Sequence, residues 1–328
     1  MGTFGSSQAG FAQNFLAVMR PPSLVCQYMI DTGLSLYHEA YRMGGSCGQH
    51  TSINATPAAG EDGHGRGTYG LDHTSMSQKE WAGHTEHCDE FWLAEDCTRY
   101  IDRMDVPCCS IGSYYDFMCQ GSVASFVGRQ HLGDTNSRGQ QQLILGPWLH
   151  GRYSKGSDVG ELTYPPTAAF DVKAHMVEYF KHYMCQQPRM PQPAVRYYRM
   201  GAVGESAAPG NDWLDATDWP IPAAVTPFYL SPDGSLSMMI DSVEPGASSV
   251  VADPSEPADT GGGGGFAGAA DARSFETSGA TGSVLTFTSD TLDEPVEWTG
   301  AVRAKLFVQV DGEDADFIAR VSDVCFYT

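Results

Sequence analysis

The chain has 328 residues, and 41% of them are apolar, so it is long enough for two or three globular domains with real cores. Its 19 basic and 40 acidic side chains give a formal net charge of −21. Such a charge repels nucleic acid and anionic membrane surfaces over most of the protein surface. We therefore expect a small-molecule acyl substrate or a short peptide as partner, and neither nucleic acid nor a membrane.

The cysteines and the start of the chain bear on the cellular compartment. Nine cysteines, an odd number that includes the neighbours Cys108 and Cys109, do not have the spacing of a disulfide framework. The chain begins without the charged and apolar regions of a signal peptide, and no run approaches the ~18 apolar residues of a membrane-spanning helix. These features predict a protein of a reducing compartment such as the cytoplasm.

The first predicted elements are the end of a strand at Met1–Phe4 and a helix at Ala9–Met19. Apolar residues recur at helical spacing in the second segment, and a Pro-Pro pair at 21–22 ends it. Residues 31–103 lack strand-like alternation and are rich in Gly, His and acidic residues, with only short helical patches such as 88–100. This composition is typical of an inserted lid.

A pattern of alternating strands and helices follows the lid. An apolar run at 106–111 leads through a loop into a helical stretch at 122–131. A second short strand is predicted at 142–145, and residues 172–184 have the clearest helical periodicity in the chain. This order predicts an α/β core with a parallel sheet that is covered on both faces.

The pattern changes after Pro193 to short alternating strands. Residues 227–230 and 236–240 flank a Pro-Asp-Gly turn, and apolar residues alternate with others over 302–310. Residues 243–280 are rich in Pro, Gly, Ala and Asp, which predicts a flexible loop. We expect this part of the chain to form a β-sandwich around that loop.

The Gly-Ser-Ser sequence at 5–7 is followed by small residues at 9 and 10. In the G-x-S pattern, this describes a sharp turn between a strand and a helix, with Ser7 as the exposed nucleophile. The helix N-terminus offers partial positive charge and backbone N–H groups, and the Gln8 amide is the expected donor to an oxyanion. Taken alone, a Gly-Ser cluster at a chain start is more often a frayed linker.

Two further residues fit a catalytic triad with Ser7. Asp116 follows one predicted strand and His150 follows the next, so both would lie at the carboxyl ends of parallel strands, where ligand sites collect. A serine becomes a nucleophile beside a base that a third group orients, and the order Ser, Asp, His is that of the α/β-hydrolases. Each partner alone has an ordinary explanation, a helix N-cap for Asp116 and a surface loop for His150.

Short motifs extend the pattern along almost the whole chain: GTFGSS at 2–7, YD at 115–116, GPWLH at 146–150, DWP at 218–220 and PFYL at 227–230. Together they resemble the cocaine esterase and X-Pro dipeptidyl-peptidase family of serine hydrolases. The resemblance implies an α/β-hydrolase core with a helical cap, a C-terminal jelly-roll domain, and cleavage of acyl esters, amino-acid esters or X-Pro peptides. It also implies Ser7 as nucleophile, Asp116 as acid and His150 as base, without a cofactor.

The resemblance divides the chain into three parts. It predicts a partial α/β-hydrolase core at 1–30 and 104–200, a helical cap insertion at 31–103, and a linker with a partial jelly roll at 201–328. Members of the family have further strands before the elbow, together with a tyrosine hydroxyl that is the second oxyanion donor. We therefore expect residues 1–328 to be an internal part of a larger hydrolase and nearly inactive on their own.

The substrate class stays open between an ester and an X-Pro peptide, because both reactions use the same triad. A peptidase needs a carboxylate in the cap for the free amino terminus of its substrate. We favour an ester, and a jelly-roll binding module without activity is the alternative to an enzyme. The candidate carboxylates in the cap are Glu61, Asp62, Asp89, Glu90, Glu95 and Asp96.

Aromatic residues and metal-ligand types also occur near these motifs. Four aromatic residues surround the predicted acid and base and are candidates to line an acyl pocket, although aromatic residues beside strands are as often core. No second ligand pair with finger-like spacing accompanies His84, His87 and Cys88 with Cys97, so we expect no metal. The candidate pocket residues are Tyr114, Tyr115, Trp148 and Tyr153.

Overall fold

The structure is a computed structural model. It describes residues 1–41, 43, 89–153, 158–160, 162–188, 191–205, 208–253, 284–313 and 315–323. Among the helices in these residues, none is both long and apolar enough to cross a bilayer.

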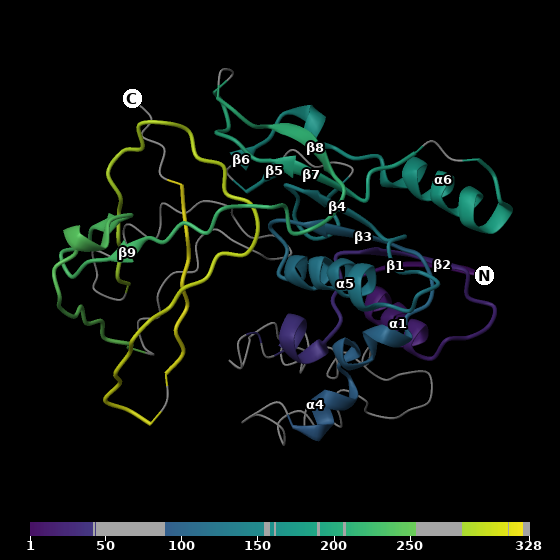
Figure 1. The fold of residues 1–328 in the computed structure, drawn as a ribbon, viewed down its shortest axis with the longest axis horizontal. Coiled ribbons are helices and arrows are strands. Elements are labelled where there is room, and N and C mark those ends of the chain that lie inside the picture. Colours follow the sequence, from purple (N-terminus) through teal and green to yellow (C-terminus); the bar gives the residue numbers. More distant parts are fainter. Residues whose placement is uncertain are drawn as a thin grey trace, which may run out of the picture.

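A six-stranded mixed sheet forms the core (Figure 1). Its strand order is β1-β2-β3-β4-β7-β8, and neighbours are parallel except for β7 and β8, which are antiparallel. The α/β core predicted from the order of strands and helices is therefore confirmed. The strands are β1 (Gly2–Ser6), β2 (Cys26–Ile30), β3 (Cys108–Ser113), β4 (Gln142–Gly146), β7 (Val195–Arg199) and β8 (Asp212–Ala216).

No strand is predicted from the sequence at β2, which lies between β1 and β3. Every residue of β2 is buried, and a strand that is buried on both faces shows no alternation of apolar and polar residues. The Gln27 amide nitrogen donates to the carbonyl oxygen of Gln13 at 2.7 Å, and the Tyr28 hydroxyl lies 2.8 Å from His175 Nδ1. As a result Asp31, which the sequence analysis places at the start of the lid, lies at the carboxyl end of a core strand.

Helices cover both faces of the sheet, with α1 (Gln8–Val18) and α5 (Cys119–Leu132) on one face and α6 (Val172–Cys185) on the other (Figure 1). Phe126 of α5 packs with Leu143 and Leu145 of β4, whereas Tyr179 of α6 packs with Ile144. Because neighbouring residues of a strand point to opposite faces of the sheet, these contacts place α5 and α6 on opposite faces. The three helices predicted from apolar periodicity are confirmed, with small shifts at their ends.

The segment predicted as a cap is described only at 31–41, 43 and 89–103. It contains a π-helix at Tyr37–Tyr41, the short helix α4 (Glu90–Ala94) and a 3-10 helix at Cys97–Arg103. Trp92 of α4 is buried, and its ring centre lies 5.6 Å from that of Tyr37. A helical cap as a whole stays a prediction, because residues 44–88 lie outside the described residues.

The main sheet continues beyond position 200, where the sequence analysis begins the linker. β8 pairs with β7, and two ion pairs cross this strand pair, Arg196 with Asp215 and Arg199 with Asp212, each at 2.8 Å. The core in the structure therefore extends to Ala216. Before β7, the chain forms a small hairpin of β5 (Asp158–Val159) and β6 (Leu162–Thr163) and a 3-10 helix at Pro166–Ala168.

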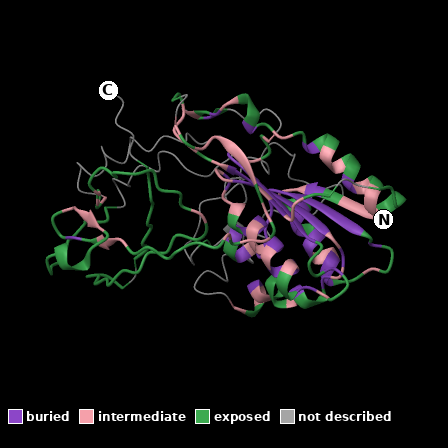
Figure 2. Ribbon diagram, turned by 45° about the horizontal axis from the view of Figure 1, so that its top comes forward, coloured by how far each residue is buried: buried purple, intermediate pink, exposed green. Residues whose placement is uncertain are grey.

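Little regular structure follows β8 in the described residues. The predicted hairpin is present but short, with β9 (Tyr229–Leu230) and β10 (Leu236–Ser237) on either side of a turn, followed by a 3-10 helix at Ile240–Ser242. The predicted strand at 302–310 is wrong: these residues pair with no described strand and are exposed, Phe307 by 92%. Figure 2 shows the described segments away from the main sheet mostly in the colour of exposed residues. Alternation stabilises a strand only when neighbouring strands supply a ladder and a buried face. The jelly roll therefore stays a prediction.

Candidate active site

Ser7 occupies a strained turn between β1 and α1. Its φ of 57° and ψ of −127° lie outside the regions that residues other than glycine ordinarily adopt. The turn is tight, because a Cβ added to Gly5 would lie 2.9 Å from Ala9 Cβ, and one added to Gly10 would lie 2.5 Å from Thr32 Cβ. The glycines at these two positions thus explain how the chain places Ser7, and not Ser6, at the apex.

Backbone groups hold the turn and leave a donor beside the serine. The Ser7 N–H donates to the carbonyl oxygens of Ile30 and Asp31 at 3.0 and 3.1 Å, and Thr32 Oγ1 donates to the Ser7 carbonyl at 2.9 Å. In the part of the chain that the structure describes, the Gln8 N–H has no acceptor. This N–H at the first residue of α1 is positioned as an anion donor next to the Ser7 side chain.

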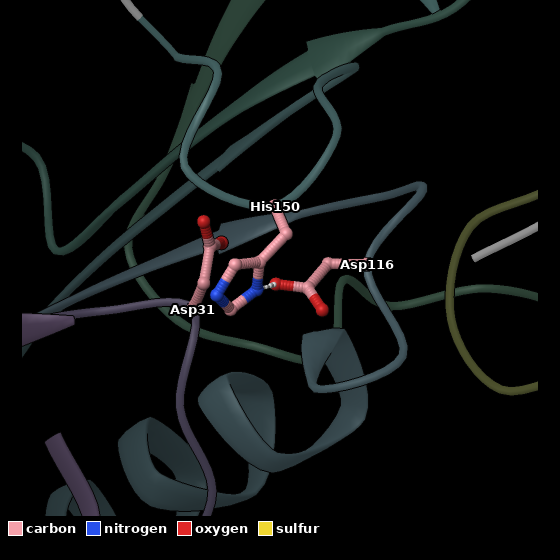
Figure 3. A group of neighbouring side chains, drawn as sticks. All are labelled: Asp31, Asp116 and His150. Atoms are coloured by element: carbon pink, nitrogen blue, oxygen red, sulfur yellow. Dashed lines mark hydrogen bonds and ion pairs between the residues drawn. The ribbon is translucent and has the colours of Figure 1, made fainter. Parts of the chain in front are cut away.

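Asp116 and His150 meet at the carboxyl ends of β3 and β4 (Figure 3). His150 Nδ1 lies 2.7 Å from Asp116 Oδ2, while Asp116 Oδ1 accepts a hydrogen bond from the Met118 N–H at 3.0 Å. The Asp116 side chain is fully buried and that of His150 is 10% exposed. The Phe117 ring stacks on the imidazole with centres 5.9 Å apart. The Asp116 hydrogen bond at Nδ1 and the Phe117 ring against one face of the imidazole together fix its orientation.

Burial and charge act on the His150 pKa in opposite directions. Burial by itself lowers it, but the Asp116 hydrogen bond and the negative charges of Asp116 and Asp31 together raise the pKa of His150 above its usual value. A base whose protonated form is stabilised in this way is suited to accept a proton during a reaction.

Asp31 is a site residue that the sequence analysis does not identify. It follows β2, is completely buried, and its Oδ2 accepts a hydrogen bond from the Gly151 N–H at 2.8 Å. Burial, and then the Asp116 charge, raise the pKa of Asp31 to about 7 against the opposing Gly151 hydrogen bond. The signal in the sequence is an acidic residue that directly ends the apolar run of β2.

The carboxylates of Asp31 and Asp116 and the imidazole of His150 have ligand atoms within 4.8 Å of one another, so this group is chemically able to hold a cation. The sequence analysis expects no metal, and it considers a different set of residues. Of that set, Cys97 is buried in an apolar cluster, and the other three residues lie outside the described residues. Because His150 Nδ1 is already engaged by Asp116, we interpret the group as acid–base machinery.

The four aromatic candidates for a pocket have different surroundings. Trp148 is fully buried, and its Nε1 donates to the Ala168 carbonyl at 2.8 Å, so it belongs to the core, the alternative that the sequence leaves open for these aromatic residues. Tyr114 packs in the apolar clusters around β4, and the Tyr115 hydroxyl lies 2.6 Å from that of Tyr164. Tyr153 is partly exposed and packs edge-on against Trp148.

The structure brings the predicted acid and base into contact. The predicted nucleophile lies at the same end of the sheet, two strands from the strand that precedes Asp116 and three from the strand that precedes His150. The described hydrogen bonds of Ser7 run through its backbone groups, and a Ser7–His150 hydrogen bond is not among them. Such bonds are often long without substrate and form in its complex. Two cap carboxylates have local roles, because Asp89 and Asp96 accept hydrogen bonds from the N–H groups of Phe91 and Thr98 at helix starts.

Two family models match the chain. Residues 1–152 match the X-Pro dipeptidyl-peptidase (S15 family), and residues 189–325 match the X-Pro dipeptidyl-peptidase C-terminal non-catalytic domain. Cocaine esterase of Rhodococcus sp. (strain MB1 Bresler) is 30% identical over 256 residues, which are 72% of this chain and 41% of that protein. The chain therefore spans about two fifths of the length of this curated relative.

Solved structures share the fold. An aminopeptidase from the marine sediment archaeon Thaumarchaeota archaeon matches with a TM-score of 0.54 and 19% identity, over 73% of this chain and 42% of that chain. An alpha-amino acid ester hydrolase matches with a TM-score of 0.53 and 20% identity, over 73% of this chain and 43% of that chain. A CocE/NonD family hydrolase from Staphylococcus aureus has a TM-score of 0.53 at 17% identity, over 73% and 38% of the two chains.

Proposed function

Because the chain belongs to the cocaine esterase and X-Pro dipeptidyl-peptidase family of serine hydrolases, we propose that it cleaves a small acyl ester through an acyl-enzyme. Ser7 is the nucleophile, His150 the general base and Asp116 the acid that orients the base. The observation that supports this proposal is the buried Asp116–His150 pair at 2.7 Å. It lies at the carboxyl ends of the parallel strands, where the strained Ser7 turn also lies.

The proposed mechanism follows from the two nitrogen atoms of the imidazole. Asp116 engages Nδ1, so Nε2 is the atom that takes the Ser7 proton while Oγ bonds to the substrate carbonyl carbon. The Gln8 N–H donates to the oxyanion that develops at the carbonyl oxygen. His150 then protonates the leaving alcohol, and a water molecule repeats the sequence on the acyl-enzyme.

We place an ester before a peptide with a free amino terminus because two of the four candidate cap carboxylates that the structure describes have other roles. Recognition of an ammonium group needs a carboxylate that is available to it. Asp89 and Asp96 accept hydrogen bonds as helix caps, and Asp96 is also almost fully buried. Glu90 is exposed and Glu95 is half-buried, whereas Glu61 and Asp62 lie outside the described residues. Cleavage of X-Pro peptides or amino-acid esters and amides is the second candidate, favoured by the family models, and a binding module without activity is the third.

A fluorophosphonate probe tests the proposal directly, since it reacts with activated serines even where turnover is slow. We expect labelling of Ser7, its loss in Ser7→Ala, and its retention in the matched control Ser6→Ala. Labelling on Ser6, or none on a folded chain, would contradict the proposal. Hydrolysis of p-nitrophenyl acetate against that of an X-Pro p-nitroanilide then separates esterase from peptidase activity.

A further inference from the structure

We propose that Asp31 is a positioning residue that ties together the three loops of the candidate site and places a second carboxylate beside the base. This inference rests on the proposed serine-hydrolase function. It concerns a residue that lies outside the Ser7, Asp116 and His150 triad.

Asp31 is bonded to all three triad-bearing segments. Its carbonyl oxygen accepts from the Ser7 N–H at 3.1 Å, and its N–H donates to the carbonyl oxygen of Ile111, in the strand that leads to Asp116, at 2.8 Å. Its side-chain Oδ2 accepts from the N–H of Gly151, the residue after His150, at 2.8 Å. A shift of Asp31 would therefore move the nucleophile, the acid and the base relative to one another.

The conformation and burial of Asp31 are unfavourable for an ordinary structural residue. Its φ is 46°, in the left-handed region, and its side chain is fully buried with Oδ1 lacking a hydrogen-bond partner among the described residues. Asparagine tolerates the same backbone conformation and would also accept from the Gly151 N–H without burying an ionisable group. The feature that only aspartate supplies here is negative charge.

That charge faces the groups of the proposed reaction. One carboxylate oxygen of Asp31, one of Asp116 and one ring nitrogen of His150 lie within 4.8 Å of one another, and Figure 3 shows the imidazole with a carboxylate on either side. Cys119 and Tyr153 are the other titratable groups that interact electrostatically with Asp31. When Nε2 takes the Ser7 proton, a carboxylate close to the ring stabilises the imidazolium that forms.

The charge also sets how the base titrates. Asp31 contributes to the raised pKa of His150, and burial and Asp116 bring the pKa of Asp31 itself to about 7. Because the two groups lie close together and each affects the charge of the other, their titrations are coupled, and the acid limb of the pH–rate profile reports them together. Removal of the Asp31 charge lowers the pKa of His150 and moves that limb to lower pH.

The test is Asp31→Asn in the 328-residue chain, with the rate of Ser7 labelling by a fluorophosphonate measured against pH. We expect the acid limb to move to lower pH and the plateau rate to fall roughly tenfold, because the base is less basic. Glu39→Gln is the matched control: Glu39 is also buried and accepts backbone N–H bonds, from Leu34 and Ser35, and we expect an unchanged limb.

A ¹⁵N-histidine NMR titration of His150 does not depend on reaction at Ser7. It therefore distinguishes a failure of the Asp31 inference from a failure of the proposed function. A His150 pKa that falls in Asp31→Asn supports the inference even where labelling is absent. Equal His150 titration curves in the variant and the original chain would overturn it. Asp31→Gly, which also suits the backbone conformation, replaces Asp31→Asn should that variant not fold. A labelling rate that EDTA abolishes in the original chain would identify a metal site and overturn it too.

Discussion

Buried carboxyl groups next to the site make the stability of the fold depend on pH. Burial is the main cause that raises the pKa of Asp31 and of Glu39 to about 7 in the folded chain. The unfolded values are near 4. Between those two pH values the folded chain binds more protons than the unfolded chain, so the free energy of unfolding falls as pH rises from about 4 to about 7.

Asp31→Asn should flatten this dependence, because the amide that replaces the carboxyl does not ionise. We expect the difference in melting temperature, variant minus original chain, to increase as pH rises from 4 to 7 and to stay constant above pH 7. Thermal unfolding followed by circular dichroism over this range checks it. Parallel curves for the two chains would show that Asp31 does not titrate in this window.

Two Asp–His pairs among the described residues allow a controlled test of the proposed acid. Asp116 pairs with His150 in a buried site, whereas Asp218 pairs with His131 at 3.0 Å on the surface. Asp116→Asn should lower kcat for ester hydrolysis by about 10³–10⁴-fold, since the amide no longer holds the correct imidazole tautomer. Asp218→Asn should leave kcat unchanged. Similar losses in the two variants would argue against the special role of Asp116.

At the scale of elements, the contact between α1 and the segment after β2 positions the nucleophile. Gly10 on α1 lies against Thr32, whose hydroxyl donates to the Ser7 carbonyl. The amide of Asn14, one turn further along α1, donates to the Gly33 carbonyl, and its oxygen accepts from Arg129 of α5, which is fully buried. Asn14 of α1 thus links α5 to the segment that follows β2, and Thr32 of that segment holds the Ser7 turn.

Gly10→Ala should both destabilise the fold and slow labelling of Ser7. An added Cβ would lie 2.5 Å from Thr32 Cβ and 2.6 Å from Thr32 Oγ1, so Thr32 must move. We expect a loss of about 1–3 kcal/mol in the free energy of unfolding, measured by urea denaturation. Gly128→Ala is the control, because an added Cβ there would crowd the Ile101 side chain, chiefly its Cδ1, and not the segment that holds Ser7. That variant should lose stability without a change in labelling, and a labelling defect of equal size would contradict the prediction.

At the scale of the whole molecule, one edge of the main sheet is formed by β1. Among the described strands, β1 pairs with β2 alone, and Phe4 on this edge strand is 64% exposed. An open parallel edge with exposed apolar side chains is a template for association between chains. The described site also offers one backbone donor to an oxyanion, the Gln8 N–H, whereas the resemblance implies a second donor from strands before the elbow.

We predict that a version extended with the upstream strands of a related hydrolase is more soluble, melts at higher temperature and turns over esters faster than residues 1–328. The added donor alone should raise kcat by about 10²–10³-fold. Soluble yield, thermal unfolding and p-nitrophenyl acetate turnover of the two versions check this. Equal turnover by a monomeric, cooperatively melting 328-residue chain would contradict it.

Much of the α/β core and the candidates for the triad can be predicted from the sequence, because both depend on patterns within short stretches of the chain. Helical periodicity is visible within each helix, and Asp116 and His150 each follow an apolar run that becomes a strand. The same reliance on local periodicity gives a wrong prediction for the alternating segment at 302–310. Its periodicity predicts a strand, but no described strand lies beside it to supply hydrogen bonds, so its apolar residues stay exposed.

The sequence by itself determined the candidates Ser7, Asp116 and His150, their order along the chain and the strand that precedes each of them. Only the tertiary structure decided that Asp31 lies among them and that Trp148 is core. Both outcomes depend on pairing between distant segments: β2 enters the sheet between β1 and β3, and Trp148 is covered by the segment that leads to α6. Burial and electrostatic coupling arise from such non-local contacts, and a local pattern of residue types does not encode them.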